Sequence, residues 1–200
     1  MALYLASQSP RRHQLLSGLG VEFSGLPIDI DERMQTLESA EGFVSRLARE
    51  KAGAGLAVLA DRGESQALVL GSDTAVVVDR EILGKPRDRD EFLDMMEQLS
   101  GRAHDVMTAI ALASHDRIDV EVVTSRVVFC DLMPEQARAY WETGEPLDKA
   151  GGYAVQGLAS VFIKRIEGSY SAIVGLPLRE TAQLLTRRGV AVWSGALASV

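Results

Sequence analysis

A chain of 200 residues that is 46% hydrophobic and 24% charged lies in the ordinary globular range and can bury a full core in one domain, or at most two. Its formal net charge of −7 disfavours a nucleic acid polymer as partner, because a phosphate backbone would be repelled. No apolar run approaches the ~20 residues that span a bilayer, and the first residues lack the basic segment of a signal peptide. We therefore expect no membrane partner and a cytoplasmic location.

Hydrophobic periodicity predicts alternating strands and helices in the first half of the chain. Pro10 suits the first position of a helix that ends before Gly20, and Asp79 and Arg80 have the composition of a tight hairpin turn. In chain order, the expected strands are residues 3–6, 67–70, 74–78 and 82–83, and the expected long helix is residues 39–56.

The second half mixes both element types as well. Asp88 and Glu91 have capping-box spacing ahead of a helix that ends near Gly101, and Pro134 opens a helix through Trp141. The remaining expected elements are strands at residues 106–113, 120–132 and 161–166, a turn at 115–117, and a last helix after residue 177. This mixture predicts an α/β fold around a mixed sheet. We expect residues after about 193 to be loosely ordered.

Several common catalytic devices are missing from the sequence. The single cysteine, Cys130, excludes an internal disulfide, and its apolar neighbours predict a small buried side chain rather than a nucleophile. There is no Gly-x-Ser-x-Gly elbow and no Walker-type loop, and His13, His104 and His115 lack metal-ligand spacing. We expect His104 to enter a strand and His115 to lie in a turn.

The segment from Ser9 to Arg12 carries the clearest chemical signal. Ser9 is a natural N-cap and Pro10 suits the first helical position, so Arg11 and Arg12 fall in the first helical turn. Cations there oppose the helix dipole, which favours anions. Two arginines in this place make sense if an anion lies between them and the backbone amides, which predicts a phosphate site. That both arginines are simply solvated remains an open alternative.

Two acidic positions suit a hard cation. Glu32 ends an acidic segment that begins at Asp29, and Asp73 is predicted to end an apolar strand. Magnesium typically binds through one or two carboxylates plus phosphate oxygens. An ordinary polar loop is the better interpretation for Asp29. Open α/β sheets, however, bind ligands beyond the carboxyl ends of their strands, which favours a functional role for Asp73.

Two lysines extend this set. Lys51 follows Phe43 and Leu47 at four-residue spacing, so it lies on an apolar helix face, from which it could also snorkel to solvent. Lys85 lies in a Gly-Lys-Pro turn, which is expected to expose its side chain but does not indicate what it binds. Four cations and two acidic sites fit phosphoryl transfer, in which catalysis is mostly positioning and charge stabilisation.

A series of motifs, in order from residue 3 to about residue 185, resembles the Maf family. They are Leu-Ala-Ser-Gln-Ser-Pro-Arg-Arg (5–12), Asp-Glu (31–32), Ala-Arg-Glu-Lys-Ala (48–52), Gly-Ser-Asp-Thr (71–74), Gly-Lys-Pro (84–86), Leu-Ser-Gly (99–101), Gly-Glu-Pro-Leu-Asp-Lys-Ala-Gly (144–151) and Gly-Leu-Pro-Leu (175–178). The resemblance implies one Maf-like domain over residues 1–200, with an elongated, twisted mixed sheet flanked by helices and two lobes around a deep central cleft. Such a fold is akin to that of the inosine triphosphate pyrophosphatases, and a homodimer is implied as well.

The resemblance also implies an activity, namely metal-dependent hydrolysis of a nucleoside triphosphate between its α and β phosphates. It makes Asp73 the general base and a metal ligand, two roles that the sequence does not separate, and Glu32 a ligand of Mg²⁺ or Mn²⁺. The residues implied to hold the triphosphate are Ser9, Arg11, Arg12, Lys51 and Lys85.

Substrate choice is implied by Arg11, Thr74 and Gln156, which are similar to the branch that acts on dTTP, UTP and modified UTP-like nucleotides as a house-cleaning enzyme. The Gln156 amide offers a donor and an acceptor, which match the N3–H and O4 edge of uracil or thymine. Ser72 departs from this branch, which often has Ala there. Two alternatives stay open, the related 7-methyl-GTP branch and a non-catalytic nucleotide-binding regulator of cell division.

Overall fold

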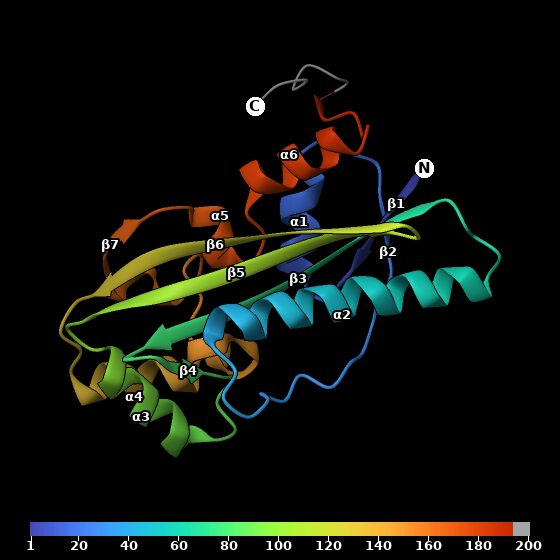
Figure 1. Ribbon diagram of the computed structural model, residues 1–200. Helices are drawn as coiled ribbons and strands as arrows, with labels where there is room; N and C mark the ends of the chain where they lie inside the picture. Colours follow the sequence, from blue (N-terminus) through green and yellow to red (C-terminus); the bar gives the residue numbers. More distant parts are fainter. Residues whose placement is uncertain (194–200) are drawn as a thin grey trace. The chain divides into compact units, whose positions relative to one another are not determined.

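Within residues 1–193, which the computed structural model describes, seven strands form one mixed sheet flanked by helices (Figure 1). The hydrogen-bonded strand order is β2-β1-β3-β5-β6-β7, and β4 pairs with β3. The strands are β1 (Ala2–Ala6), β2 (Ser24–Gly25), β3 (Ala67–Val78), β4 (Glu81–Leu83), β5 (Ala103–Ser114), β6 (Arg117–Phe129) and β7 (Ile163–Glu167). The helices are α1 (Pro10–Ser17), α2 (Ala40–Asp61), α3 (Arg89–Leu99), α4 (Pro134–Glu142), α5 (Tyr170–Val174) and α6 (Leu178–Arg187), and the 3₁₀ turns are η1 (Glu145–Asp148), η2 (Ala150–Gly152) and η3 (Leu158–Phe162). The predicted α/β class is confirmed.

The chain divides into two compact units. Unit 1 consists of residues 1–73, 108–123 and the chain from residue 175 onward, and unit 2 consists of residues 74–107 and 124–174. In unit 1, α2 covers one face of the strands, while α1 and α6 lie on the other (Figure 1). The apolar core of unit 1 includes Leu5, Leu16, Leu70, Ile110 and Leu185.

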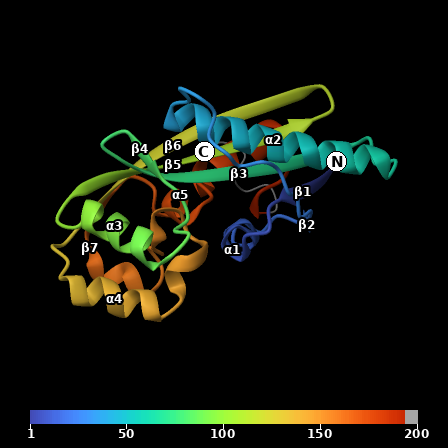
Figure 2. The same ribbon diagram turned by 90° about the horizontal axis from the view of Figure 1, so that it is seen from below.

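Unit 2 has its own core. Helices α3 and α4 pack side by side (Figure 2), and Phe92 of α3 contacts the rings of Tyr140 and Trp141 of α4. Tyr153 and Phe129 form an edge-to-face pair at 4.9 Å between ring centroids. Each unit therefore buries a separate hydrophobic cluster.

No helix among residues 1–193 has the length and apolar character to traverse a lipid bilayer.

Several predicted bounds differ from those in the structure. The strand predicted at 120–132 ends at Phe129, and the helix predicted at 39–56 continues to Asp61. The two predicted strands at 67–70 and 74–78 are one continuous strand, β3, so Asp73 lies inside a strand and not at its end. The predicted strand at 161–166 is preceded by η3 and begins only at Ile163. Cys130 is exposed rather than buried, because β6 ends at the buried Phe129 and the chain has left the strand at Cys130.

His104 enters β5 as predicted, and it is buried in the core of unit 2. Its Nε2 lies 2.7 Å from the hydroxyl of Tyr153, and its Nδ1 has no hydrogen-bond partner among the described residues. Burial lowers the pKa of His104 to about 4. Since the unfolded chain takes up this proton near pH 6.5, whereas the folded chain does so only near pH 4, acidification across that window favours unfolding.

We expect the wild type to lose roughly 3 kcal/mol of unfolding free energy through this group as the pH falls from about 6.5 to about 4. His104→Phe removes this part of the pH dependence, which urea unfolding at a series of pH values measures. His115→Gln in the exposed β5–β6 turn is the matched control and keeps the wild-type slope. An unchanged slope in His104→Phe contradicts the assignment.

Candidate active site

The pairing of β1 with β3 determines where the arginine-bearing segment lies. The two strands are parallel, and Ala6, the last residue of β1, is paired with Gly71 of β3. The chain that follows Ala6 therefore runs beside the residues that follow Gly71. This register brings the first turn of α1, which carries Arg11 and Arg12, to the same edge as Asp73.

Helix α2 approaches the sheet closely at the same place. Gly71 allows this approach, because a Cβ there would overlap the carbonyl oxygen of Ala48 and lie 2.8 Å from the backbone nitrogen of Ala52. A Cβ on Gly55, one turn further along α2, would lie 2.7 Å from a side-chain carbon of Val69. Lys51 lies between these contacts on α2 and is only 7% exposed. The close packing of α2 thus carries a lysine into the interior of unit 1.

Gly71→Ala is expected to lower the free energy of unfolding by roughly 3 kcal/mol, because the added methyl group meets backbone atoms that cannot rotate away. Gly53→Ala is the matched control on α2, since a Cβ at Gly53 meets nothing within 4 Å and alanine is the better helix former. Urea unfolding measures both variants, and equal stability of the two would contradict the proposed close approach.

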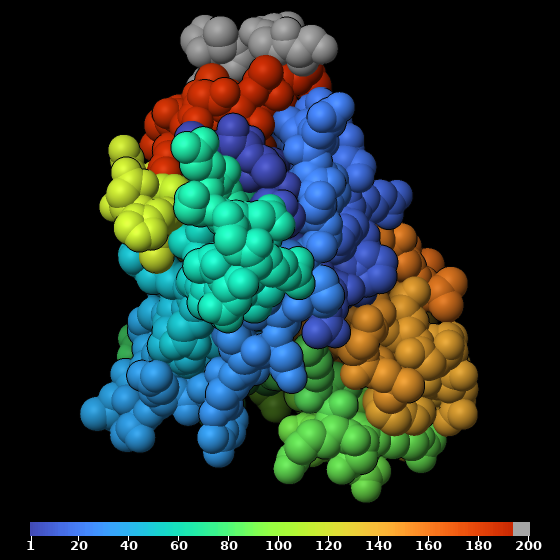
Figure 3. Space-filling model, turned by 90° about the vertical axis from the view of Figure 1, so that its right-hand side faces the viewer, coloured from blue at the N-terminus to red at the C-terminus, as the bar shows by residue number. Residues whose placement is uncertain are grey.

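Lys51 joins two carboxylates. Its Nζ lies 2.8 Å from Oδ1 of Asp73 and 2.6 Å from Oε1 of Glu32. Asp73 is almost as buried as Lys51, whereas Glu32 has a 44% exposed side chain and belongs to the irregular segment that runs over the surface beside α2 (Figure 3). An ammonium group has three donors, and these contacts use two of them. Lys51 therefore does not snorkel to solvent.

Asp73 has a perturbed proton affinity. Burial raises the pKa of Asp73 above its ordinary value, and this effect outweighs the opposing attraction of Lys51 and Arg12. The charge on Glu32 raises the pKa of Asp73 slightly further. A carboxylate whose pKa is moved towards neutrality is better suited to accept a proton than an ordinary surface carboxylate. Asp73 thus has the environment of a general base.

Arg12 belongs to the same cluster. Its Nε donates a 2.9 Å hydrogen bond to the carbonyl of Gly175. Burial lowers the pKa of Arg12, Asp73 opposes this shift, and the neighbouring charge of Arg11 adds to it. The guanidinium remains protonated at all relevant pH values. The solvated-surface alternative is therefore wrong for Arg12, and both arginines are half-buried.

Ser9 lies before α1 at the N-cap position, as predicted, but its side chain makes no capping hydrogen bond. Its backbone nitrogen donates to Oγ of Ser7 at 3.1 Å instead. Pro10 is the first helical residue, also as predicted. Ser9, Arg11 and Arg12 thus lie on one segment, and the charge of Arg12 interacts with that of Asp73.

The other predicted site residues, Thr74, Lys85 and Gln156, belong to unit 2. Within this unit, the Gly84 carbonyl accepts a 2.9 Å hydrogen bond from the backbone of Gly151, so the turn that carries Lys85 is fastened to the segment that leads to Gln156. Lys85 and Gln156 are exposed, and Thr74 is half-buried.

Sequence reasoning missed Glu145, which organises the loop around Gln156. Its carboxylate accepts hydrogen bonds from the hydroxyl of Tyr140 at 2.6 Å and from the backbone nitrogens of Leu158 and Ala159 at 3.0 and 3.4 Å. The bonded residues Leu158 and Ala159 lie two and three positions after Gln156. The Gly-Glu-Pro motif is recognisable in the sequence. Its neighbouring residues, however, do not indicate that the Glu145 carboxylate accepts hydrogen bonds from Leu158 and Ala159.

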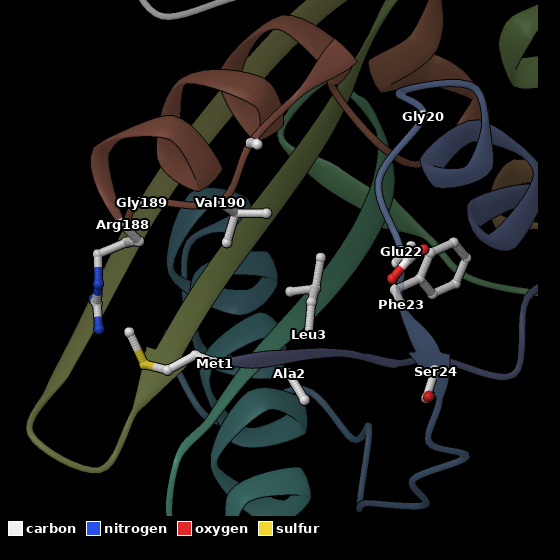
Figure 4. Close-up of a pocket in the computed structure, with 11 residues that line it drawn as sticks. Met1, Ala2, Leu3, Gly20, Glu22, Phe23, Ser24, Arg188, Gly189 and Val190 are labelled. Carbon is white, nitrogen blue, oxygen red and sulfur yellow. The ribbon is translucent and has the colours of Figure 1, made fainter. Parts of the chain in front are cut away.

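A separate pocket of about 720 Å³ lies in unit 1 at the beginning of β1 (Figure 4). Arg11 and Arg12, by contrast, come after the last residue of β1. Its lining comes from the first residues of β1, the segment around Phe23 and the chain after α6, including Arg188. It contains none of the predicted site residues. Among residues 1–193, no three His, Cys, Asp or Glu side chains gather closely enough to hold a metal ion by themselves.

The chain was compared with models of known protein families. The family model described as "Maf-like protein" matches residues 2–188, nearly the whole length. The chain belongs to the Maf family. The predicted resemblance is thereby confirmed, and the cluster around Lys51 lies on motifs of a Maf protein.

Curated Maf relatives are close in sequence. A protein of Pseudoalteromonas atlantica is 50% identical over 189 residues, covering 94% of this chain and 98% of that protein, and one of Colwellia psychrerythraea is 51% identical over 187 residues, covering 94% and 88%. One of Hahella chejuensis is 49% identical over 193 residues, covering 96% and 94%. All three are named dTTP/UTP pyrophosphatase. Among solved structures, the Staphylococcus aureus Ham1 protein overlaps 66% of this chain and 73% of its own at 14% identity, with a TM-score of 0.48.

Proposed function

We propose that this Maf protein is a nucleoside triphosphate pyrophosphatase that hydrolyses dTTP and UTP to the monophosphate and pyrophosphate. The observation that carries the proposal is the buried Lys51, which bonds to both Asp73 and Glu32 in the unit that also holds Arg11 and Arg12. Burying the two charged groups Lys51 and Asp73 costs several kcal/mol and is seldom maintained for stability alone. The names of the curated relatives support the same activity.

In the proposed reaction, ionised Asp73 accepts a proton from a water molecule, whose oxygen then attacks the α phosphorus. The bond from the α phosphorus to the bridging oxygen of the β phosphate breaks, and pyrophosphate leaves with the bonding electron pair. Arg11, Arg12 and Ser9 bind the phosphate oxygens and offset the charge that develops on the leaving group. Lys51 orients Asp73 through the 2.8 Å contact and presents its third donor to the phosphates.

The site also fits a divalent cation. Asp73 and Glu32 both reach the ammonium of Lys51, so two carboxylates lie close enough to share one cation. Magnesium is held by such a small set of carboxylates together with substrate phosphates. We assign Glu32 and Asp73 as the protein ligands, and a bound Mg²⁺ or Mn²⁺ would neutralise phosphate charge.

We assign base selection to unit 2. Gln156 and Thr74 are the residues that would distinguish dTTP and UTP from other nucleotides, and Lys85 would contribute a further cation to the phosphates. Glu145 bonds to the backbone of Leu158 and Ala159, shortly after Gln156. We expect these bonds to limit the positions that the Gln156 amide can take. Gln156→Glu is expected to weaken the selection of uracil and thymine, because a carboxylate cannot donate to O4.

The nucleotide range is tested by pyrophosphate release from dTTP, UTP, CTP, dATP, GTP and 7-methyl-GTP with Mg²⁺ or Mn²⁺. We expect dTTP and UTP to be turned over fastest, and no turnover without divalent metal. Preference for 7-methyl-GTP would retain the reaction and overturn the role of Gln156. Tight UTP binding without any turnover would indicate a nucleotide-binding regulator.

We further propose that both units form one Maf-like domain, that the protein acts in the cytoplasm, where nucleoside triphosphates are found, and that it forms a homodimer. Light scattering of the purified protein tests the last point, and a monomeric mass would contradict it. The expected loosely ordered tail after about residue 193 lies outside the residues that the structure describes.

A further inference from the structure

Ser72 precedes Asp73 in β3 and is completely buried. Its hydroxyl lies 2.9 Å from the carbonyl oxygen of Gly175 and 3.0 Å from that of Ala109. A serine hydroxyl has one proton, so Ser72 shares it between two acceptors. A buried hydroxyl with this arrangement determines how both carbonyl groups are oriented.

The Gly175 carbonyl is the same group that binds Arg12. It accepts the 2.9 Å bond from Nε of Arg12 in addition to the bond from Ser72. Gly175 has a φ of 125°, a backbone conformation that side-chain-bearing residues rarely adopt. A glycine peptide has little intrinsic preference among orientations, so its hydrogen bonds decide the direction of its carbonyl.

We infer that Ser72 is a positioning residue for Arg12, acting through the carbonyl of Gly175. Ser72 fixes the direction of that carbonyl, and the carbonyl in turn holds the Nε side of the guanidinium. The guanidinium is thereby kept next to Asp73 and ready to bind phosphate oxygens in one orientation. The inference rests on the proposed function and deepens it, because it explains how a cation of the site is held.

The one-oxygen change Ser72→Ala tests this inference directly. The alanine methyl group fits the space of the serine side chain. The Gly175 carbonyl, however, loses the hydrogen bond from Ser72, so its direction is less fixed and the Arg12 guanidinium bonded to it is less well oriented. Because the branch acting on dTTP and UTP often has Ala at this position, the Ser72 hydroxyl refines the orientation of Arg12 in this chain and is not indispensable. We therefore expect kcat/KM for dTTP to fall by roughly 3- to 10-fold, well below the ~100-fold that a 1 Å misplacement of a positioning group can cost. Melting temperatures check that the variant is folded.

A double-mutant cycle separates positioning from general loss of stability. If Ser72 acts through Arg12, Ser72→Ala has little further effect on kcat/KM in an Arg12→Ala background. Ser125→Ala is the matched control, because Ser125 is also buried on a strand and bonds backbone groups of Ser169 in unit 2. This control keeps the wild-type kcat/KM. If Ser72→Ala does not fold, Ser72→Cys, which has a similar volume and a weaker donor, replaces it in the same cycle.

The outcomes are distinguishable from failure of the proposed function. A wild type that releases no pyrophosphate from any nucleotide overturns the proposed function itself. An active wild type in which Ser72→Ala keeps full kcat/KM, or in which its effect multiplies unchanged with that of Arg12→Ala, overturns only the positioning role. A reduced kcat/KM whose effect disappears with Arg12 supports it.

Discussion

Asp73→Asn is expected to lower kcat for dTTP by about 10²- to 10⁴-fold, the contribution that a positioned general base typically makes. The amide has nearly the same shape and can still accept a hydrogen bond from Lys51, but it cannot take a proton from water. Pyrophosphate release under saturating dTTP and Mg²⁺ measures the loss. Calorimetry with dTTP checks that the nucleotide still binds.

Asp29→Asn is the matched control for this prediction. Asp29 is an exposed carboxylate in the segment that contains Glu32, and the polar-loop reading assigns it no part in the reaction. The control is expected to keep the wild-type kcat. An Asp73→Asn variant that turns over dTTP within a few-fold of the wild type would remove Asp73 from the role of base.

Lys51→Met has a second large expected effect, on activity and on its pH dependence. Lys51 is the strongest of the groups that lower the pKa of Asp73 against burial, so its removal raises that pKa further. The base must be ionised to act, and activity is lost as the pH falls through its pKa. We therefore expect the acid limb of the kcat/KM profile to move to higher pH.

The same variant is expected to show the corresponding stability change. Above the raised pKa, Lys51→Met leaves a buried, charged Asp73 without its partner, which costs about 3–5 kcal/mol. Below that pKa, the folded state binds a proton that the unfolded chain binds only at lower pH, so the loss of stability becomes smaller on acidification. Urea unfolding at several pH values measures this trend.

Lys149→Met serves as the control for both measurements. Lys149 is likewise largely buried, with 14% of its side chain exposed, and it pairs with Asp148 in unit 2. It is expected to leave the acid limb in place. If Lys51→Met and Lys149→Met shift the profile equally, or if neither shifts it, Lys51 does not control the ionisation of Asp73.

The part of the site on α1 could be predicted because it follows local rules. Ser9 and Pro10 mark the start of a helix in the sequence alone, and this places Arg11 and Arg12 in its first turn, as the structure confirms. The prediction that Asp73 ends a strand is wrong. Asp73 lies inside β3, but β1 ends opposite Gly71, so the arginines and Asp73 still meet at one edge.

The error at Gly71 has a physical cause. In a sequence, Gly-Ser-Asp resembles a break between two strands, because glycine and short polar residues are common in turns. Here glycine is required by the close approach of α2, and the strand continues through it. A single sequence does not show which helix packs on which strand. A glycine required by close helix packing could therefore not be distinguished from a glycine in a turn.

The supporting contacts could not be predicted for a related reason. Arg12 and Ser72 bond to Gly175, which lies 163 and 103 residues further along the chain, and no periodicity connects such distant positions. The polar bonds of Glu145 to the loop after Gln156 likewise depend on the folded path of the chain. Sequence patterns therefore indicated the charged groups of the candidate site, whose roles stay predictions, but not the groups that hold them.

The central claim, cleavage between the α and β phosphates, is tested most directly by ³¹P NMR of dTTP incubated with the wild-type protein and Mg²⁺. The account predicts that the dTTP signals are replaced by those of dTMP and pyrophosphate in equal amounts, and that Asp73→Asn leaves dTTP intact over the same time. Formation of dTDP and inorganic phosphate would place the cleavage at the γ phosphate and contradict the account.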